Sequence, residues 1–157
     1  MEISLRAARE SDIDWLEPFY ENLMRPYVEL THPWDAMRFR ESFDPSLASI
    51  IVADGRDIGL LKKELRSGDL YLGDIQIHSD YQGAGIGTNL VRQVIAEGES
   101  LGLPVRLRVH KGNPAHQWYL RLGFTVETEL NNCYQLIKLA EQVGAPNPLQ
   151  SSSDVSR

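Results

Sequence analysis

The sequence is poor in cysteine and contains no long apolar run. Its 157 residues include a single cysteine, Cys133, which excludes an internal disulfide and a zinc site built from several cysteines. Cys133 opens an apolar run and is more typical of a partly buried strand residue than of a nucleophile. The longest apolar stretches, such as residues 50–53, fit a strand and fall far short of the ~20 residues of a membrane span. Residues 1–6 lack the basic start and apolar core of a secretory signal. We therefore expect a cytoplasmic protein without membrane contacts.

Positive charge is also in short supply. Sixteen Lys and Arg residues stand against 22 Asp and Glu, which gives a formal net charge of −6. A protein that binds nucleic acid through its phosphates usually carries a basic face. We expect no nucleic-acid partner, and an acidic surface is more compatible with an amine substrate.

Apolar periodicity and turn residues predict the order β α α β β β α β α β β. Strands are expected at residues 2–8, 47–53, from 58 to 66, 70–77, 105–109, 124–130 and 133–139. The first helix should begin with Ser11 as its N-cap and run to about Leu23, with Pro26 and Pro33 interrupting an aromatic-rich helical segment after it. A further helix should cover residues 88–101. The order predicts a mixed α+β fold with helices on both faces of the sheet. Residues 1–142 should form one domain, and the Pro- and Ser-rich residues 143–157 a flexible tail.

A glycine-rich turn carries the strongest functional signal. Residues 82–87 read Gln-Gly-Ala-Gly-Ile-Gly and lie between an apolar strand and an amphipathic helix. Three glycines let the backbone curl so that several N–H groups and the helix N-terminus face one anion, such as a pyrophosphate. A glycine turn that merely permits tight packing is the structural alternative.

Two nucleotide-binding motifs do not fit this turn. A P-loop requires Lys followed by Ser or Thr after its last glycine, whereas Gly87 is followed by Thr88 and Asn89. A Rossmann turn requires Gly-x-Gly-x-x-Gly and an acidic residue at the end of the next strand. Here the spacing is Gly-x-Gly-x-Gly, and the next strand ends in His110 and Lys111 without an acid.

The turn resembles the GNAT superfamily of acetyl-CoA-dependent N-acetyltransferases, whose signature is Gln/Arg-x-x-Gly-x-Gly/Ala after a central strand. A proline common in that family is replaced by Ser79. Residues 113–124 (NPAHQWYLRLGF) resemble a second family motif, Asn-x-x-Ala followed by Tyr-x-x-x-Gly-Phe. The resemblance extends over residues 3–139 and is strongest at residues 70–124.

The resemblance implies a sheet that is mostly antiparallel and splayed at the strand before the glycine turn, with the pantetheine arm of acetyl-CoA in the wedge. It implies no metal cofactor. The residues that would contact acetyl-CoA are Ile75, Ile77, Gln82, Gly83, Ala84, Gly85, Ile86, Gly87, Thr88 and Asn113. For Asn113, an N-cap role is a sufficient alternative explanation.

The resemblance also implies direct attack of a neutral amine on the acetyl group, with no covalent enzyme intermediate. Tyr119 matches the tyrosine that protonates the departing thiolate, although a core role is the alternative. Asp74 is the first candidate for the general base, provided strand alternation does not point it away from the wedge. Four further residues remain open as bases: His78, His110, Glu29 and His32.

The acceptor amine is not identified by the sequence. The segment between the first two helices is expected to line its site, with Tyr27, Glu29 and Trp34 as substrate-binding candidates that cage an ammonium group. Packing of these aromatic residues on the sheet explains them equally well. The acceptor is expected to be a small-molecule or peptide amine, and a homodimer is compatible with the resemblance. Two other functions stay open, a non-catalytic acyl-CoA-binding module and a protein-binding domain.

Overall fold

The computed structural model describes residues 1–141, in which one seven-stranded sheet is covered by helices. The strands are β1 (Ile3–Ala7), β2 (Ala48–Ala53), β3 (Arg56–Leu65), β4 (Leu70–Ile77), β5 (Val105–His110), β6 (Thr125–Glu129) and β7 (Cys133–Lys138). The helices are α1 (Ile13–Val28), α2 (Arg38–Ser42), α3 (Ile86–Leu101) and α4 (Ala115–Arg121), with short 3₁₀ turns η1 (Glu10–Asp12), η2 (Pro45–Leu47) and η3 (Ser79–Tyr81). The predicted order of elements is confirmed. The predicted tail, residues 143–157, lies outside the described residues.

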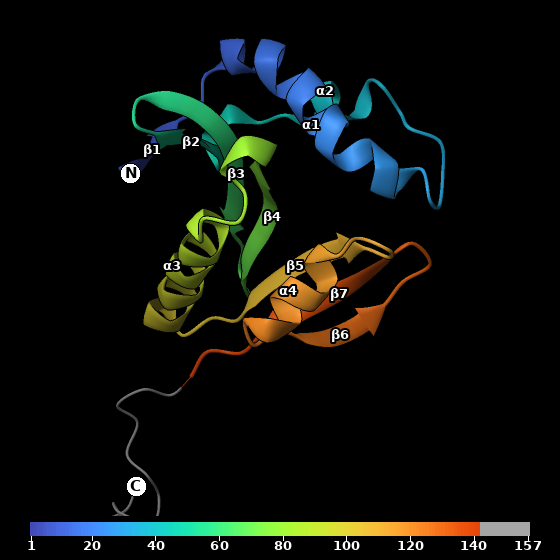
Figure 1. The fold of residues 1–157 in the computed structure, drawn as a ribbon. Helices are drawn as coiled ribbons and strands as arrows, with labels where there is room; N and C mark the ends of the chain where they lie inside the picture. The colour runs from blue at the N-terminus through green and yellow to red at the C-terminus, as the bar shows by residue number, and fades with distance from the viewer. Residues whose placement is uncertain (142–157) are drawn as a thin grey trace, which may run out of the picture.

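The sheet order is β1-β2-β3-β4-β5-β7-β6, and only β4 and β5 pair in parallel. That pairing joins just Leu70–Leu72 to Val105–Leu107, so the two strands separate beyond Leu72. Figure 1 shows β4 running away from β5 toward α1. The mixed fold and the predicted splay are confirmed.

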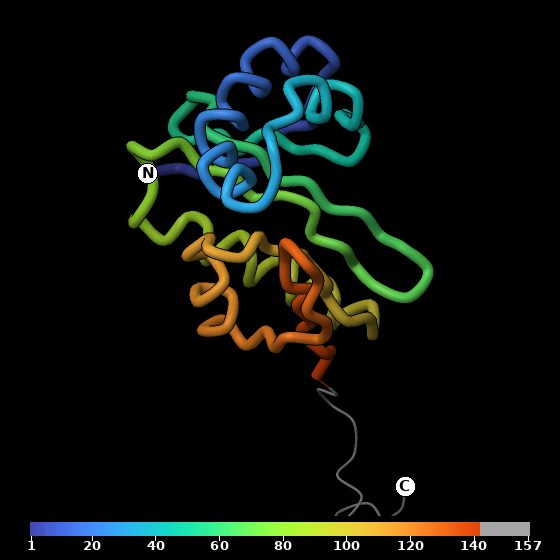
Figure 2. Tube along the Cα trace, turned by 90° about the vertical axis from the view of Figure 1, so that its right-hand side faces the viewer, coloured from blue at the N-terminus to red at the C-terminus, as the bar shows by residue number. Residues whose placement is uncertain are grey.

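Helices cover both faces of the sheet because its central strands are apolar on both sides. Ile50 packs with Leu16 of α1 on one face, while its neighbour Ile51 belongs to the cluster with Val91 of α3 on the other. This period-two alternation follows from strand geometry. Figure 2 shows the N-terminal half and the chain from β5 onward as two parts that meet along the centre of the sheet.

The first helix departs from the sequence prediction at both ends. Ser11 does not cap it: Asp12 is the N-cap residue, and its carboxylate accepts the Arg9 N–H at 2.8 Å. The buried ion pair of Asp12 with Arg6, at 2.8 Å, holds this turn in place. At the other end, α1 continues through Pro26 to Val28, because packing of its apolar face outweighs the one backbone hydrogen bond that the proline removes.

The segment after α1 is less helical than predicted. Residues 29–37 form turns and irregular chain. Between α1 and β2, the only α-helix is α2, at Arg38–Ser42. Helix α3 begins at Ile86, two residues before the predicted start, because Gly85 in the left-handed region (φ 84°) forms its N-cap. Residues 29–37 thus form an irregular, aromatic-containing segment that lies over β3 and β4.

Candidate functional site

The glycine turn opens onto a cavity of about 740 Å³ between β4, α3 and α4, here called the glycine-turn cleft. All the residues predicted to contact acetyl-CoA line it except Ala84. Tyr119 lines it as well, and so does Tyr27, which was predicted on the acceptor side. The structure thus brings the predicted acetyl-CoA residues together. It places Tyr27 beside them and apart from Trp34, the other aromatic residue predicted to bind the acceptor.

The turn itself has the conformation and the free space that an anion requires. Gly83 and Gly85 have φ of 83° and 84°, and a Cβ on either would meet no atom within 4 Å. Helix α3 follows directly and has no side-chain cap, so the N–H groups of its first turn lack side-chain acceptors. Backbone donors and the positive end of the helix dipole therefore point into open space.

The edge of β4 that faces β5 is unpaired over its second half. The N–H of His78 donates to Ile58 of β3 at 2.8 Å, so His78 faces β3. Successive residues of a strand alternate in direction, and the Ile77 carbonyl accepts from Gln82 Nε2 at 2.8 Å on the opposite edge. The N–H groups of Ile75 and Ile77 therefore lie on the splayed edge and have no β5 partner.

Helix α4 closes the cleft from the other side. Pro114, and not the predicted Asn113, is the N-cap residue of α4. The Asn113 side-chain oxygen accepts the Ala115 N–H at 2.9 Å just before the helix, and its ligand role stays a prediction. Trp118 Nε1 donates to Thr88 Oγ1 at 3.0 Å and ties α4 to α3. The Thr88 hydroxyl accepts this bond. The Thr88 backbone N–H, in the first turn of α3, takes no part in it.

Tyr119 is buried in the core between Trp118 and Phe124, with ring centroids 4.8 and 5.7 Å away. Burial, and to a smaller extent the charge of Asp74, raises the pKa of its phenol above the ordinary value of 10.0. Tyr119 therefore carries its proton at neutral pH. A protonated phenol beside the cleft has the properties of a general acid.

Asp74 lies on the opposite face of β4 and lines a second cavity of about 710 Å³, here called the aromatic cavity. Strand alternation does point Asp74 away from the glycine-turn cleft, so the condition set for its role as general base is not met, and Asp74 could act only on an amine that enters from the aromatic cavity. Burial raises the pKa of Asp74 to about 6, an increase opposed by Lys62, Gln76 and Tyr20. Above pH 6 its carboxylate is ionised and able to accept a proton.

The walls of the aromatic cavity come from α1, α2, the loop between them and strands β3 to β5. Tyr20 stacks on Phe39 at 4.5 Å, and Phe39 on Phe43 at 5.9 Å. Trp34, predicted to bind substrate, lines this cavity together with His32 and His110, whose rings lie 6.3 Å apart. Sequence reasoning missed Tyr20 and Lys62, because their nearness to Asp74 depends on helix placement and strand register.

The remaining candidates lie outside both cavities. Glu29 forms an ion pair with Arg25 at 3.1 Å on the surface of α1. His78 accepts the Asp80 N–H at 3.1 Å and caps η3. Cys133 is buried at the start of β7, as its sequence context predicted.

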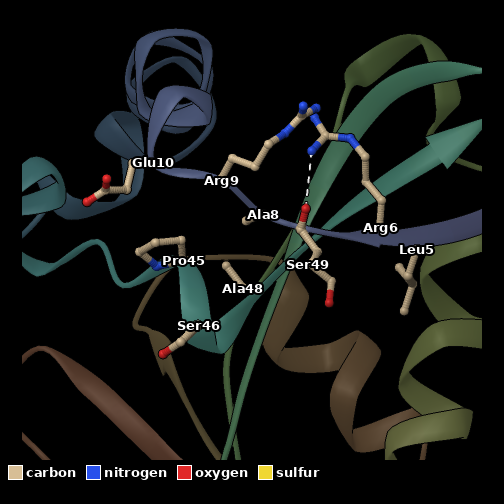
Figure 3. Close-up of a pocket in the computed structure, with 10 residues that line it drawn as sticks. Leu5, Arg6, Ala8, Arg9, Glu10, Pro45, Ser46, Ala48 and Ser49 are labelled. Atoms are coloured by element: carbon tan, nitrogen blue, oxygen red, sulfur yellow. Dashed lines mark hydrogen bonds between the residues drawn. The ribbon is translucent and has the colours of Figure 1, made fainter.

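A third, shallower cavity lies far from this chemistry, between β1 and η2 (Figure 3). Its Arg6 guanidinium is held by Asp12 and Asp57 at 2.8 and 2.9 Å. The other lining groups are mainly small side chains, with Arg9 extended along the rim. This arrangement stabilises the start of α1 and carries no reactive constellation.

Two further classes of site were sought. Within residues 1–141, no three His, Cys, Asp or Glu side chains are grouped to hold a metal ion. No helix in that range combines the length and apolar composition that a membrane span requires.

Comparison with known proteins agrees with the geometry. Similar solved structures include the PaiA N-acetyltransferase of Thermoplasma acidophilum in complex with coenzyme A, with a TM-score of 0.72, 20% identity and coverage of 88% of this chain and 99% of that one. An acetyltransferase from Thermus thermophilus has a TM-score of 0.68, 20% identity and coverage of 88% and 97%. The Arabidopsis thaliana protein Naa50, in complex with a bisubstrate analogue, has a TM-score of 0.63, 18% identity and coverage of 88% and 99%.

At these identities the solved structures establish the fold. No curated protein matches the sequence. The family model of the acetyltransferase (GNAT) domain matches residues 46–126, which is more than half of the chain and includes β4, the glycine turn and α4. The chain therefore belongs to the GNAT acetyltransferase family.

Proposed function

We propose that this protein transfers the acetyl group of acetyl-CoA to a primary amine of a small molecule or peptide. The observation that carries the proposal is the arrangement of two cavities about β4, one beside an anion-binding turn and one lined by a carboxylate with a raised pKa. Strands β4 and β5 do not pair beyond Leu72, and the acceptor amine would reach the acetyl group between them. Cofactor and acceptor would thus meet at the centre of the sheet.

The cleft fits acetyl-CoA on three counts. Gly83 and Gly85 leave room where side chains would otherwise project, and the start of α3 supplies N–H donors for the pyrophosphate. Ile75 and Ile77 offer unpaired backbone groups on the edge of β4, which suits an arm that binds as an added strand. When bound, acetyl-CoA supplies an activated acyl group on a thiol leaving group.

The residues around this point have the properties that the transfer requires. The Asp74 carboxylate would take a proton from the acceptor ammonium, directly or through water, and leave a neutral amine. The new C–N bond forms as the C–S bond breaks, and the N–H of Ile77 would polarise the acetyl oxygen. The Tyr119 phenol would donate its proton to the departing thiolate. The proton that the attacking nitrogen loses as the amide forms would return to the phenolate through water.

Calorimetric titration with acetyl-CoA, with NAD and ATP as controls, tests the proposal. We expect saturable one-site binding of acetyl-CoA alone, and release of free thiol when an acceptor amine is added. Binding without thiol release across amino acids, polyamines and peptides would instead favour a non-catalytic acyl-CoA-binding module. Absence of acetyl-CoA binding in folded protein would refute the assignment of the cleft.

A further inference from the structure

The aromatic cavity contains polar atoms that no protein group satisfies. Trp34 Nε1 and His110 Nδ1 are buried and lack a hydrogen-bond partner, and both residues line this cavity. Within the described chain only one other buried side-chain atom, His116 Nε2, is in this state. A buried polar atom without a partner keeps an uncompensated desolvation cost. These two atoms therefore mark polar positions in the wall of the cavity that the protein leaves unsatisfied.

Four charged side chains line the cavity, the cations Lys62 and Arg38 and the anions Asp35 and Asp74, and neither cation has an ion-pair partner within residues 1–141. Lys62 lies opposite Asp74 where β3 pairs with β4, and its charge opposes the rise in the pKa of Asp74. Asp35, also on the wall, accepts the Met37 N–H at 3.0 Å. Arg38 has no ion-pair partner within residues 1–141, whereas Arg40, two residues along α2, pairs with Glu17 at 2.9 Å.

Arg38 lies close to the other polar groups of the cavity. Burial, then His32 and then the charge of Arg38 lower the pKa of His110. Arg38 also opposes the rise in the pKa of Tyr20 that burial and Asp74 produce. Arg38, Asp74, Tyr20 and Phe39 line the same cavity, so a cationic group, a carboxylate and an aromatic surface all face one space.

We propose that the acceptor is a free amino acid with a large apolar side chain. Its carboxylate binds Arg38, its α-amino group faces Asp74, and its side chain packs on Tyr20 and Phe39. This inference rests on the proposed acetyl transfer and specifies its acceptor. A polyamine would bring a second cation toward Arg38, and a peptide would replace the carboxylate by a neutral amide.

The test compares amino acids with amines that lack the free carboxylate. Thiol release is measured with acetyl-CoA and L-phenylalanine or L-leucine, then with their carboxamides, phenethylamine and spermidine. A charge-assisted contact predicts a kcat/KM for the amino acids about 10- to 100-fold above that for the carboxamides. Arg38→Gln should raise KM for the amino acids by a similar factor and leave the carboxamides unchanged. Arg38→Lys should restore part of the preference, and Arg40→Gln serves as the matched control.

A binding measurement separates this inference from the proposed function. L-phenylalanine should change tryptophan fluorescence without acetyl-CoA, and the change should be lost in Arg38→Gln and kept in Arg40→Gln. Acetylation of spermidine or of carboxamides in preference to amino acids would overturn the inference and leave the acetyl transfer intact. Failure to bind acetyl-CoA, with amino-acid binding intact, would overturn the proposed function and the acceptor role with it, and would leave only an amino-acid site in the aromatic cavity.

Discussion

Asp74 and Ile75 are consecutive residues of β4, yet they line two different cavities on opposite sides of the strand. Ile75 lies in the glycine-turn cleft, and Asp74 lies in the aromatic cavity beneath α1 and α2. Because β5 leaves β4 beyond Leu72, no neighbouring strand separates the two spaces at this level. A single strand therefore presents backbone donors to one ligand and a carboxylate to another.

Replacement of Tyr119 by Phe should lower kcat by about 10²-fold, the usual contribution of a general acid. The ring remains and fills the same space between Trp118 and Phe124, so the affinity for acetyl-CoA should change little. Steady-state thiol release and calorimetric titration measure the two quantities. Tyr71→Phe is the control, since Tyr71 is also on β4, packs beneath Arg66 and lines neither cavity. Wild-type turnover in Tyr119→Phe would remove the acid role.

Replacement of Gly85 by Ala should weaken acetyl-CoA binding, because the new methyl group projects into the space assigned to the pyrophosphate. Its positive φ also makes any side chain costly, by about 1–2 kcal/mol. Gly55→Ala isolates that cost: Gly55 has φ +83°, has no atom within 4 Å of an added Cβ, and lies in the turn between β2 and β3. Both variants should lose similar thermal stability. Equal acetyl-CoA affinity in the two would contradict the pyrophosphate assignment.

The sequence allowed prediction of the features that depend on local chemistry. The order of elements and the position of the glycine turn follow from periodicity and turn residues, and the splayed sheet was implied by the family resemblance. The residues named for the cofactor lie within two short stretches and one strand, so nearly all of them face one cleft. Local sequence was sufficient because these residues are close together along the chain.

The acceptor side depended on tertiary placement. Glu29 was grouped with Trp34 from sequence proximity, but α1 continues past Pro26 and turns Glu29 to the surface beside Arg25. Arg38 and Tyr20 are 18 positions apart and meet only when α2 folds back on α1. Packing of α1 on the sheet, rather than any local signal, determines which side chains surround Asp74.

Replacement of Asp12 by Ala should destabilise the protein by about 1–3 kcal/mol, because the Arg9 N–H and the Trp15 indole N–H lose their acceptor while Arg6 keeps Asp57 as its partner. Asp12 is buried, and its carboxylate bonds to Arg6, Trp15 Nε1 and the Arg9 N–H. Hydrogen bonds from Arg6 lead the causes that lower its pKa below the usual range. Its stabilising contribution is therefore present above about pH 4 and is lost as the pH falls below that value. Thermal unfolding of Asp12→Ala measures the loss, with exposed Asp14→Ala as control.

Replacement of Asp74 by Asn should lower kcat by about 10²- to 10⁴-fold while leaving acetyl-CoA affinity intact. In the wild type, the base must be ionised, and the pKa of Asp74 is raised to about 6. The wild-type kcat should therefore fall as the pH drops through about 6, and Asp74→Asn should lack this acidic limb. An unchanged pH profile in the variant would assign the base to another group, with His110 in the same cavity as the next candidate.

The same substitution should stabilise the folded protein at neutral pH. Because the folded state binds the Asp74 proton more tightly than the unfolded state, the contribution of this group to stability falls as the pH rises from about 4 to about 6. Above that range, folding holds a desolvated carboxylate at a cost of at most about 3 kcal/mol. Asp74→Asn removes the cost, so its melting temperature should exceed that of the wild type at pH 8 and approach it near pH 4. A lower melting temperature for the variant at pH 8 would show that Lys62, Tyr20 and Gln76 stabilise the ionised carboxylate more than its burial destabilises it. In that case the affinity of Asp74 for a proton would be too low for the proposed base.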